Sequence, residues 1–191
     1  MSGNIKIILI SGMPGSGKSE AASVLKEMGV LVLSMGDVVR YNYEKYKKAN
    51  ESLLEFALRI RREKGKGVVA ELTLEFLKGS DVKIVGIEGV RSIEEVEVFR
   101  RFSKEIVLIS IHAPPYLRYR RILSRYREDD PKVLDEIIRR DFKELELGIG
   151  SVIAMSDYII VNDKDLESFK RKCRELFEMI IYGKNNSESR A

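Results

Sequence analysis

The sequence contains very few of the residues that build disulfides and metal sites. Within its 191 residues it has one cysteine, Cys173, and one histidine, His112. A single cysteine excludes a disulfide within the chain and any zinc site built on several cysteines, and a single histidine excludes a cluster of histidine ligands. Such counts are typical of proteins of the reducing cytoplasm, and we expect that location.

Long hydrophobic runs are also missing. The longest apolar stretches, such as residues 7–10, have the length of a strand. A membrane-spanning helix needs about 20 consecutive apolar residues, and a signal peptide needs an apolar core before a small-residue cleavage site. The sequence therefore predicts neither a membrane-spanning nor a secreted protein.

Charge of one sign does not dominate either. The net charge is +4, and 34% of the residues are charged, against about 25% in typical domains. The two signs are interspersed, which indicates a solvated surface. No aromatic–basic pattern of a known nucleic-acid module is present, so we expect no nucleic-acid partner.

What the sequence does have is an alternation of short apolar runs with longer segments of helical period. This order is typical of a parallel sheet covered by crossover helices, an α/β fold. Residues 1–183 are long enough for one domain with a substantial core. The expected strands, rich in Ile, Val and Leu, are residues 5–10, 30–33, 82–87, 105–111 and 158–161.

Two segments depart from this regular alternation. Residues 35–80 are too long for one crossover helix, and their apolar spacing predicts two or three helices inserted as a subdomain. Residues 184–191 are polar and rich in helix breakers. We expect the latter to form a frayed or disordered tail.

The strongest motif directly follows the first expected strand. It satisfies the pattern G-x-x-x-x-G-K-[ST], and the segment after it reads as a helix. Glycines allow successive backbone N–H groups to surround a phosphate, and the lysine and hydroxyl reach the outer phosphates and Mg²⁺. The sequence therefore predicts a nucleotide-binding loop for Mg-ATP, formed by Gly12, Met13, Pro14, Gly15, Ser16, Gly17, Lys18 and Ser19.

A second segment gives this loop a family context. The loop, with Pro and Ser between its glycines, is followed by Leu-Ser-Met-Gly-Asp-Val-Val-Arg at residues 33–40. Together they resemble adenylate kinase and its nucleoside-monophosphate-kinase relatives. The resemblance implies that Arg40 holds the phosphate of an acceptor nucleotide and that Asp37 lies near the magnesium waters. It also implies a three-layer α/β/α P-loop kinase fold in which residues 35–80 bind the acceptor.

The third expected strand leads into Glu88-Gly-Val-Arg91, which is similar to the acidic-Gly-x-x-Arg segment of the same family. Here Glu replaces the usual Asp, and the arginine follows the acid by three positions instead of four. The resemblance implies that Glu88 assists magnesium binding and that Arg91 clamps the acceptor phosphate. A capping or surface acid is the alternative for Glu88.

Residues 114–141 resemble a short arginine-rich lid. Helical geometry places Arg118, Arg121 and Arg125 together beside an apolar arc, and Arg140 belongs to a second helix after a turn at residues 128–131. Guanidinium groups stabilise the charge of a transferring phosphoryl group. For each arginine the alternative is a solvated helix face. The segment also contains Arg120 and Arg127.

The last expected strand and the turn after it, residues 156–163, are similar to those of adenylate and dephospho-CoA kinases, where the turn borders the adenine. By resemblance, the backbone around Asn162 lies against the base, and the alternative for the Asn162 side chain is a turn residue that contacts no ligand. The pattern from Arg140 to Tyr158, with residues 35–40, also resembles a group of archaeal P-loop proteins related to adenylate kinase.

Three functional hypotheses follow from these motifs. The first is transfer of the γ-phosphoryl group of Mg-ATP to a nucleoside monophosphate or a similar small phosphorylated acceptor, a reaction that needs no general base. The second is phosphorylation of a hydroxyl, as in dephospho-CoA kinases, with Asp37 as the base. The third is a nucleotide-binding regulator or slow ATPase with a macromolecular partner.

Overall fold

The computed structural model describes residues 5–125 and 132–183. Arg127, the turn expected at residues 128–131 and the tail expected at residues 184–191 therefore lie outside the described residues. The strands are β1 (Lys6–Ser11), β2 (Leu31–Ser34), β3 (Ile84–Val90), β4 (Ile106–His112) and β5 (Tyr158–Val161). The helices are α1 (Lys18–Glu27), α2 (Met35–Tyr46), α3 (Leu53–Lys64), α4 (Val68–Glu75), α5 (Ile93–Phe102), α6 (Pro115–Ser124), α7 (Leu134–Leu147), α8 (Ile149–Ala154) and α9 (Leu166–Tyr182).

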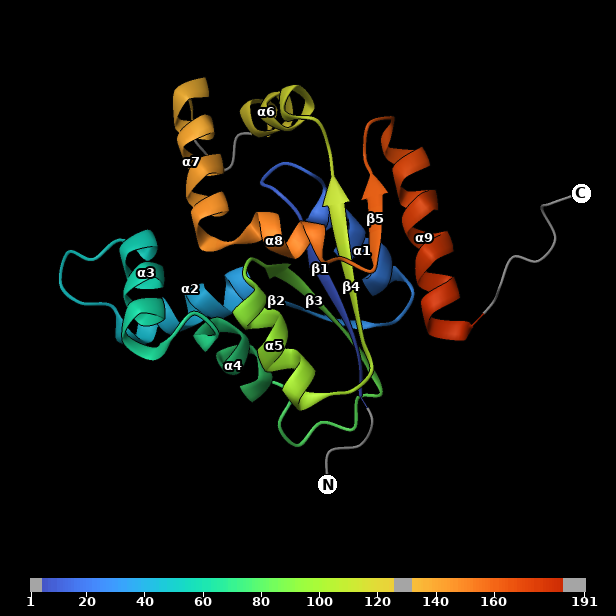
Figure 1. The fold of residues 1–191 in the computed structure, drawn as a ribbon, viewed down its shortest axis with the longest axis horizontal. Coiled ribbons are helices and arrows are strands. Elements are labelled where there is room, and N and C mark those ends of the chain that lie inside the picture. The colour runs from blue at the N-terminus through green and yellow to red at the C-terminus, as the bar shows by residue number, and fades with distance from the viewer. Residues whose placement is uncertain (1–4, 126–131, 184–191) are drawn as a thin grey trace, which may run out of the picture.

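The five strands form one parallel sheet in the order β2-β3-β1-β4-β5. Successive residues of β1 face opposite sides, so Ile7 and Leu9 pack under α5 and α8, while Ile8 and Ile10 pack under α1 and α9. Both faces are covered (Figure 1), which explains the continuous apolar runs of the strands. The predicted α/β class and five-stranded parallel sheet are confirmed.

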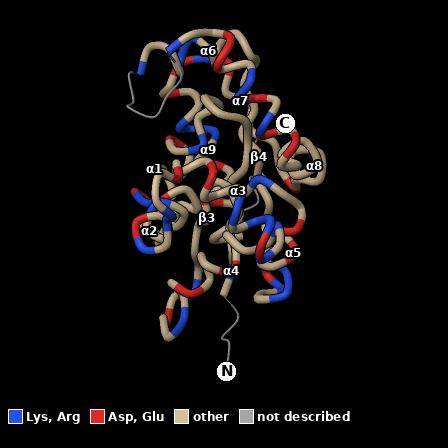
Figure 2. The backbone as a smooth tube through the Cα atoms, turned by 90° about the vertical axis from the view of Figure 1, so that its left-hand side faces the viewer, with Lys and Arg blue, Asp and Glu red and all other residues tan. Residues whose placement is uncertain are grey.

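Two regions surround the carboxyl ends of the strands. Residues 35–80 contain three helices, α2, α3 and α4, at one side of the sheet. Helices α6 and α7 lie above the strand ends (Figure 1), and the side view in Figure 2 shows them at the end of the molecule opposite α4. Parallel sheets bind ligands at this edge, where the loops after the strands converge.

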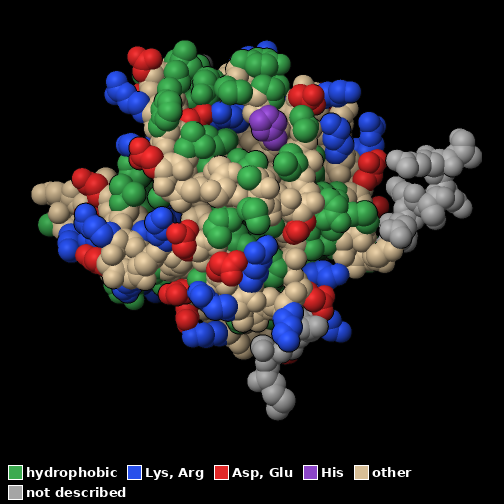
Figure 3. Space-filling model, in the orientation of Figure 1, with side chains coloured by type: hydrophobic (Ala, Val, Ile, Leu, Met, Phe, Trp, Pro, Cys, Tyr) green, Lys and Arg blue, Asp and Glu red, His purple; other side chains and the backbone are tan. Residues whose placement is uncertain are grey.

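The surface carries charged residues of both signs and a region rich in apolar side chains. Lys and Arg alternate with Asp and Glu around the molecule in Figure 2, as the sequence predicts. Apolar side chains gather over α6 and α7 in Figure 3, and exposed large hydrophobic residues there include Tyr116, Phe142 and Leu145. No helix of the described residues is long and apolar enough to cross a bilayer.

Candidate active site

A cleft of about 870 Å³ opens at the carboxyl ends of β1, β2 and β3. Its walls come from segments far apart in the sequence: the loop after β1, the start of α2, the end of β3, and helices α6 and α7. Most residues predicted for a site from the sequence meet here. The predicted residues that line the cleft are Gly12, Pro14, Gly15, Gly17, Lys18, Ser19, Asp37, Arg40, Glu88, Arg91, Arg121, Arg125 and Arg140.

The loop after β1 needs glycine for two reasons. Gly15 and Gly17 have φ angles of 76° and 106°, which L side chains rarely adopt. There is also no room for a side chain: a Cβ at Gly15 would lie 2.7 Å from the backbone oxygen of Arg118, and one at Gly17 would overlap the Asn162 amide nitrogen. The shape of the loop is therefore set by α6 and by the end of β5.

Lys18 is the first residue of α1, and its side chain folds back over the loop. Its Nζ donates hydrogen bonds to the backbone oxygens of Gly12 at 2.7 Å and Met13 at 3.2 Å. Burial lowers the pKa of Lys18 from 10.5 to about 8, while Glu88 and Glu144 act in the opposite direction. The loop carbonyls thus hold the ammonium where a phosphate can replace them as its partner.

This lowered pKa makes nucleotide affinity depend on pH. Phosphates bind the ammonium form, so the Kd for ATP is expected to rise once the pH exceeds about 8. Because protonation of Lys18 and ATP binding are linked, the Kd is expected to rise about tenfold between pH 7 and pH 9, provided that bound phosphate restores the pKa of Lys18 to its ordinary range. Titration calorimetry at pH 7, 8 and 9 measures this, with Lys18→Arg as the control, because arginine stays charged and its Kd is expected to stay level. A wild-type Kd that does not change with pH would contradict the prediction.

Two residues predicted to assist Mg²⁺ lie beside Lys18. Ser19 is exposed in the first turn of α1. Glu88 of β3 pairs with Ile10 of β1 and is the last β3 residue that pairs with β2, at Ser34. No cluster of three or more acidic, His or Cys side chains that could hold a metal occurs in residues 5–125 and 132–183. This donor set fits an ion that takes most of its oxygens from phosphate and water, as Mg²⁺ does.

The start of α2 places an ion pair at the cleft. The Ser34 side chain caps α2 by accepting a hydrogen bond from the backbone N–H of Asp37 at 3.2 Å. The Asp37 carboxylate in turn accepts hydrogen bonds from Arg40 at 2.7 and 3.3 Å. Gly36 lies beside this pair: a Cβ there would come within 3.7 Å of the Arg40 guanidinium. Asp37 and Arg40 thus line the cleft as an ion pair.

Three of the four predicted lid arginines, Arg121, Arg125 and Arg140, line the cleft. The Nη2 atom of Arg121 donates to the backbone and side-chain oxygens of Asn162, both at 3.2 Å, while its buried Nη1 finds no acceptor within residues 5–125 and 132–183. Burial, followed by the charge of Arg120, lowers the pKa of Arg121. A buried guanidinium nitrogen without an acceptor suits a site for an anion.

Arg118 lies elsewhere than the sequence predicts. It is 4% exposed and does not line the cleft. Its guanidinium forms a bidentate ion pair with Asp141 of α7, at 2.9 and 2.5 Å, and donates to the backbone oxygen of Pro14 at 3.0 Å. Tyr119 also donates to Asp141 at 3.0 Å. Arg118 therefore fastens α6 to α7 and to the loop, and its expected contact with the transferring phosphoryl group has no counterpart among these contacts.

Asn162, Ser16 and Met13 also do not line the cleft. The Asn162 amide is buried and donates to the backbone oxygen of Ser16 at 2.8 Å, while its oxygens accept from Arg121. The Asn162 side chain thus links the phosphate-binding loop to Arg121, as a turn residue that contacts protein groups. Ser16 is buried too, and its Oγ has no hydrogen-bond partner in the part of the chain that the structure describes.

Sequence reasoning missed two acidic residues that hold Arg91. Its backbone N–H donates to Glu95 at 2.7 Å, and its Nε lies 3.4 Å from Oε2 of Glu144, which also lines the cleft. Glu95 is fully buried and pairs with Arg61 at 3.1 Å. Burial raises the pKa of the Glu95 carboxyl. Both acids occupy inward positions of amphipathic helices, which is the signal that could have found them.

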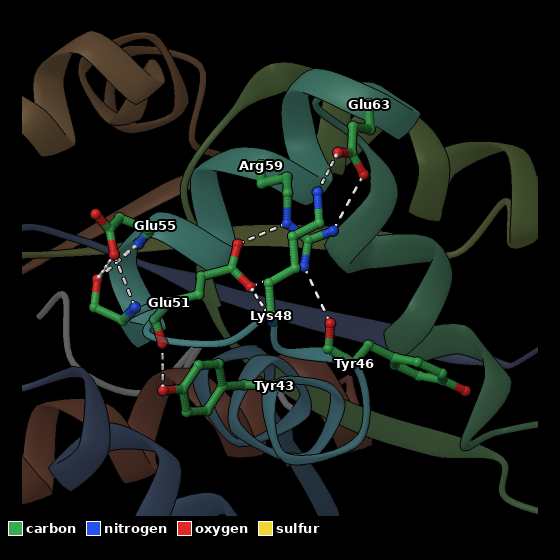
Figure 4. Close-up of polar contacts among 8 residues, drawn as sticks. Tyr43, Tyr46, Lys48, Glu51, Glu55, Arg59 and Glu63 are labelled. Carbon is green, nitrogen blue, oxygen red and sulfur yellow. Dashed lines mark hydrogen bonds and ion pairs between the residues drawn. The ribbon is translucent and has the colours of Figure 1, made fainter.

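The inserted helices also carry aromatic and basic residues that do not line the cleft, among them Tyr41, Tyr43, Arg59 and Arg62. Figure 4 shows Arg59 bound to Glu51 and Glu63 and to the backbone of Tyr46, and Tyr43 bound to the backbone of Glu51. Hydrogen bonding to Arg59 lowers the pKa of Glu51 to about 2. These contacts secure the connection between α2 and α3, and Leu53 is the α3 residue that reaches the cleft.

Solved structures that resemble this fold include shikimate kinases and a protein from Thermus thermophilus. The structure of TT1252 from that organism has a TM-score of 0.64 and 20% identity, covering 92% of this chain and 97% of that one. A shikimate kinase from *Acinetobacter baumannii*, in complex with shikimate, has a TM-score of 0.58 and 12% identity, covering 94% and 95%. At these identities the likeness shows the fold alone.

Other proteins share a much higher sequence identity with this chain than these solved structures do. A UPF0200 protein of *Saccharolobus islandicus* is 51% identical, with 93% of this chain and 95% of the relative covered. One of *Pyrococcus abyssi* is 47% identical, with 92% and 97% covered. The model of an AAA domain family matches residues 8–147, which include the phosphate-binding loop and all the residues found to line the cleft except Ile149. The chain therefore belongs to the UPF0200 family and contains an AAA-type P-loop domain.

Proposed function

We propose that the protein is a phosphotransferase that moves the γ-phosphoryl group of Mg-ATP to a nucleoside monophosphate or a similar small phosphorylated acceptor. The observation that carries this proposal is the distribution of basic residues in one cleft. Lys18 comes from the loop after β1, Arg121, Arg125 and Arg140 come from α6, its C-terminal cap and α7, and Arg40 and Arg91 follow β2 and β3. This number of cations in one cleft suits two phosphate-bearing ligands.

Each residue has a role in this proposal. The loop N–H groups and Lys18 bind the donor phosphates, Ser19 and Glu88 hold Mg²⁺, and Arg40 and Arg91 bind the acceptor phosphate. Bound Mg²⁺ neutralises charge between the phosphates. Arg121, Arg125 and Arg140 balance the charge of the transferring group. An ionised phosphate can attack without a general base, so alignment and exclusion of water are the main tasks of the cleft.

Relation to adenylate kinase remains part of this proposal. It is supported by the order of the motifs: the loop, Asp37 and Arg40 after β2, Glu88 and Arg91 after β3, and the arginines of α6 and α7. The inserted helices of residues 35–80 would bind the acceptor, and residues 114–141 would form the lid over ATP. Residues 1–183 would fold as one domain in which these parts act together.

A hydroxyl acceptor is the second candidate, and the position of Asp37 favours it. Its carboxylate lines the cleft and is oriented by Arg40. A base in that place could accept the proton of an attacking hydroxyl. Asp37→Asn separates the two candidates: it should abolish transfer to a hydroxyl, and should reduce transfer to a phosphate only as far as magnesium binding is impaired.

Phosphoryl transfer from labelled Mg-ATP to nucleoside monophosphates and dephospho-CoA tests the proposal. The expected result is turnover with one phosphorylated acceptor that is lost in Lys18→Ala. ATP binding without transfer to any member of the panel would overturn the proposal and favour a nucleotide-dependent regulator with a macromolecular partner.

A further inference from the structure

The cleft contains a buried carboxylate that the proposed mechanism does not use. Glu144 lies on α7, is 6% exposed and lines the cleft. Its Oε2 atom is buried and accepts no hydrogen bond. Glu146, two residues further along the same helix, is exposed and does not line the cleft.

The neighbouring arginine balances the charge of Glu144 without satisfying its oxygen. Nε of Arg91 is 3.4 Å from Oε2, beyond the 2.7–3.2 Å range of ordinary N–H···O hydrogen bonds. A carboxylate oxygen that is removed from water and lacks a donor is costly, and native structures rarely keep one without a reason. Among the described residues no side chain or backbone group supplies that donor.

A ligand in the cleft can supply it. An ionised carboxylate only accepts hydrogen bonds, so the complementary group is an O–H or N–H. The proposed function gives Arg91 to the acceptor phosphate, which places the donor group next to that phosphate. Leu53 and Ile149 add apolar wall to the same cleft, which suits the carbon skeleton between such groups.

We propose that Glu144 determines acceptor specificity by accepting a hydrogen bond from a hydroxyl or amino group close to the acceptor phosphate. The acceptor class is then a phosphate monoester that carries such a donor, as in a nucleotide or a sugar phosphate. This inference rests on the proposed function, because that function assigns the acceptor to this cleft. It adds the group that the site recognises besides the phosphate.

Matched ligands that differ by one donor test the inference. Binding of AMP, 2′-deoxy-AMP, 3′-deoxy-AMP and purine riboside monophosphate is measured by calorimetry, with ribose 5-phosphate and its 2-deoxy form as the smaller pair. Wild-type protein is expected to bind one donor-bearing ligand about 10- to 100-fold more tightly than its matched analogue, the range for a hydrogen bond to a charged group. In Glu144→Ala the ratio should fall below about threefold on the same scale.

Two further variants keep the result interpretable. Glu144→Gln preserves the size of the side chain and should reduce the ratio while the protein stays folded, and Glu146→Gln should keep the wild-type ratio. The inference is overturned if no pair differs in wild-type protein, if none of the ligands binds, or if the ratio survives in both Glu144 variants. Since transfer is assayed separately, turnover with an unchanged ratio would overturn this inference alone, and discrimination without turnover would overturn only the proposed kinase activity.

Discussion

Replacing Lys18 with alanine is expected to lower phosphoryl transfer at least about a hundredfold, the loss typical when one preorganised donor to a transition-state oxygen is removed. The Lys18 ammonium binds the backbone oxygens of Gly12 and Met13 within the loop and lines the cleft. Phosphate binding exchanges these carbonyls for charged oxygens, which strengthens the interaction. The measurements are the initial rate of transfer from Mg-ATP and the Kd for ATP.

The control for this prediction is Lys143→Ala on α7. Lys143 is exposed and does not line the cleft, so its variant should keep the wild-type rate. Thermal unfolding of both variants separates lost chemistry from lost folding. Burial disfavours the charged form of the Lys18 amine. Removing this side chain should therefore leave the Tm close to that of the wild type. Wild-type transfer in Lys18→Ala would contradict the assignment of the loop.

The largest expected loss of stability is that of Asp141→Ala. Asp141 and Arg118 have side chains that are 9% and 5% exposed, and they form a bidentate pair. Removing one partner leaves a buried charge without compensation, which costs about 3–5 kcal/mol of unfolding free energy. For a domain of this size each kcal/mol lowers Tm by roughly 2–4 °C. Urea unfolding and calorimetry measure both quantities.

An exposed ion pair gives the comparison. Glu97 and Arg100 of α5 pair at 3.1 Å with side chains 49% and 43% exposed, and Glu97→Ala should cost less than about 1 kcal/mol. The double variant Arg118→Met, Asp141→Leu should recover much of the loss, because no unpaired charge remains. A cost for Asp141→Ala as small as that for Glu97→Ala would show that Arg118 is hydrated instead of buried.

Local patterns in the sequence were sufficient for the strands, the loop and the order of the motifs. β1 and β4 are continuous apolar runs buried on both faces, and such runs identify strands without knowledge of their partners. The end of β3 was less well predicted. The strand continues past Ile87 to Val90 because Ser11 of β1 pairs with Val90 after an irregularity in the register, and that pairing is not visible in one segment alone.

The roles of Arg118 and Asn162 depended on contacts that periodicity does not report. Helical spacing gives the angle of a side chain around its axis, so Arg118 and Arg121 were expected on one face. It does not tell which turn of the helix meets another segment. The first turns of α6 pack on the loop at Pro14 and Gly15, while Arg121 reaches the cleft.

Asp141 and Glu144 show what a closer reading of α7 would have revealed. With Ile137 they form the buried positions of this helix, where an amphipathic pattern places apolar residues. Two acids at such positions predict partners of opposite charge from other segments. The partners, Arg118 and Arg91, lie 23 and 53 residues away in the sequence, and only the fold identifies them.

The contacts around the phosphate-binding loop also set when it can form during synthesis. The loop spans residues 12–19, yet its glycines lie against backbone oxygens of Ile111 and Arg118, and Asn162 donates to Ser16. The residues that support the loop are therefore synthesised about 100 to 150 residues after the motif itself. Contacts between such distant residues form late in folding. A nascent chain that ends before β5 contains the complete motif but lacks the support that shapes it, so nucleotide binding should arise only after β5 and Asn162 have been synthesised.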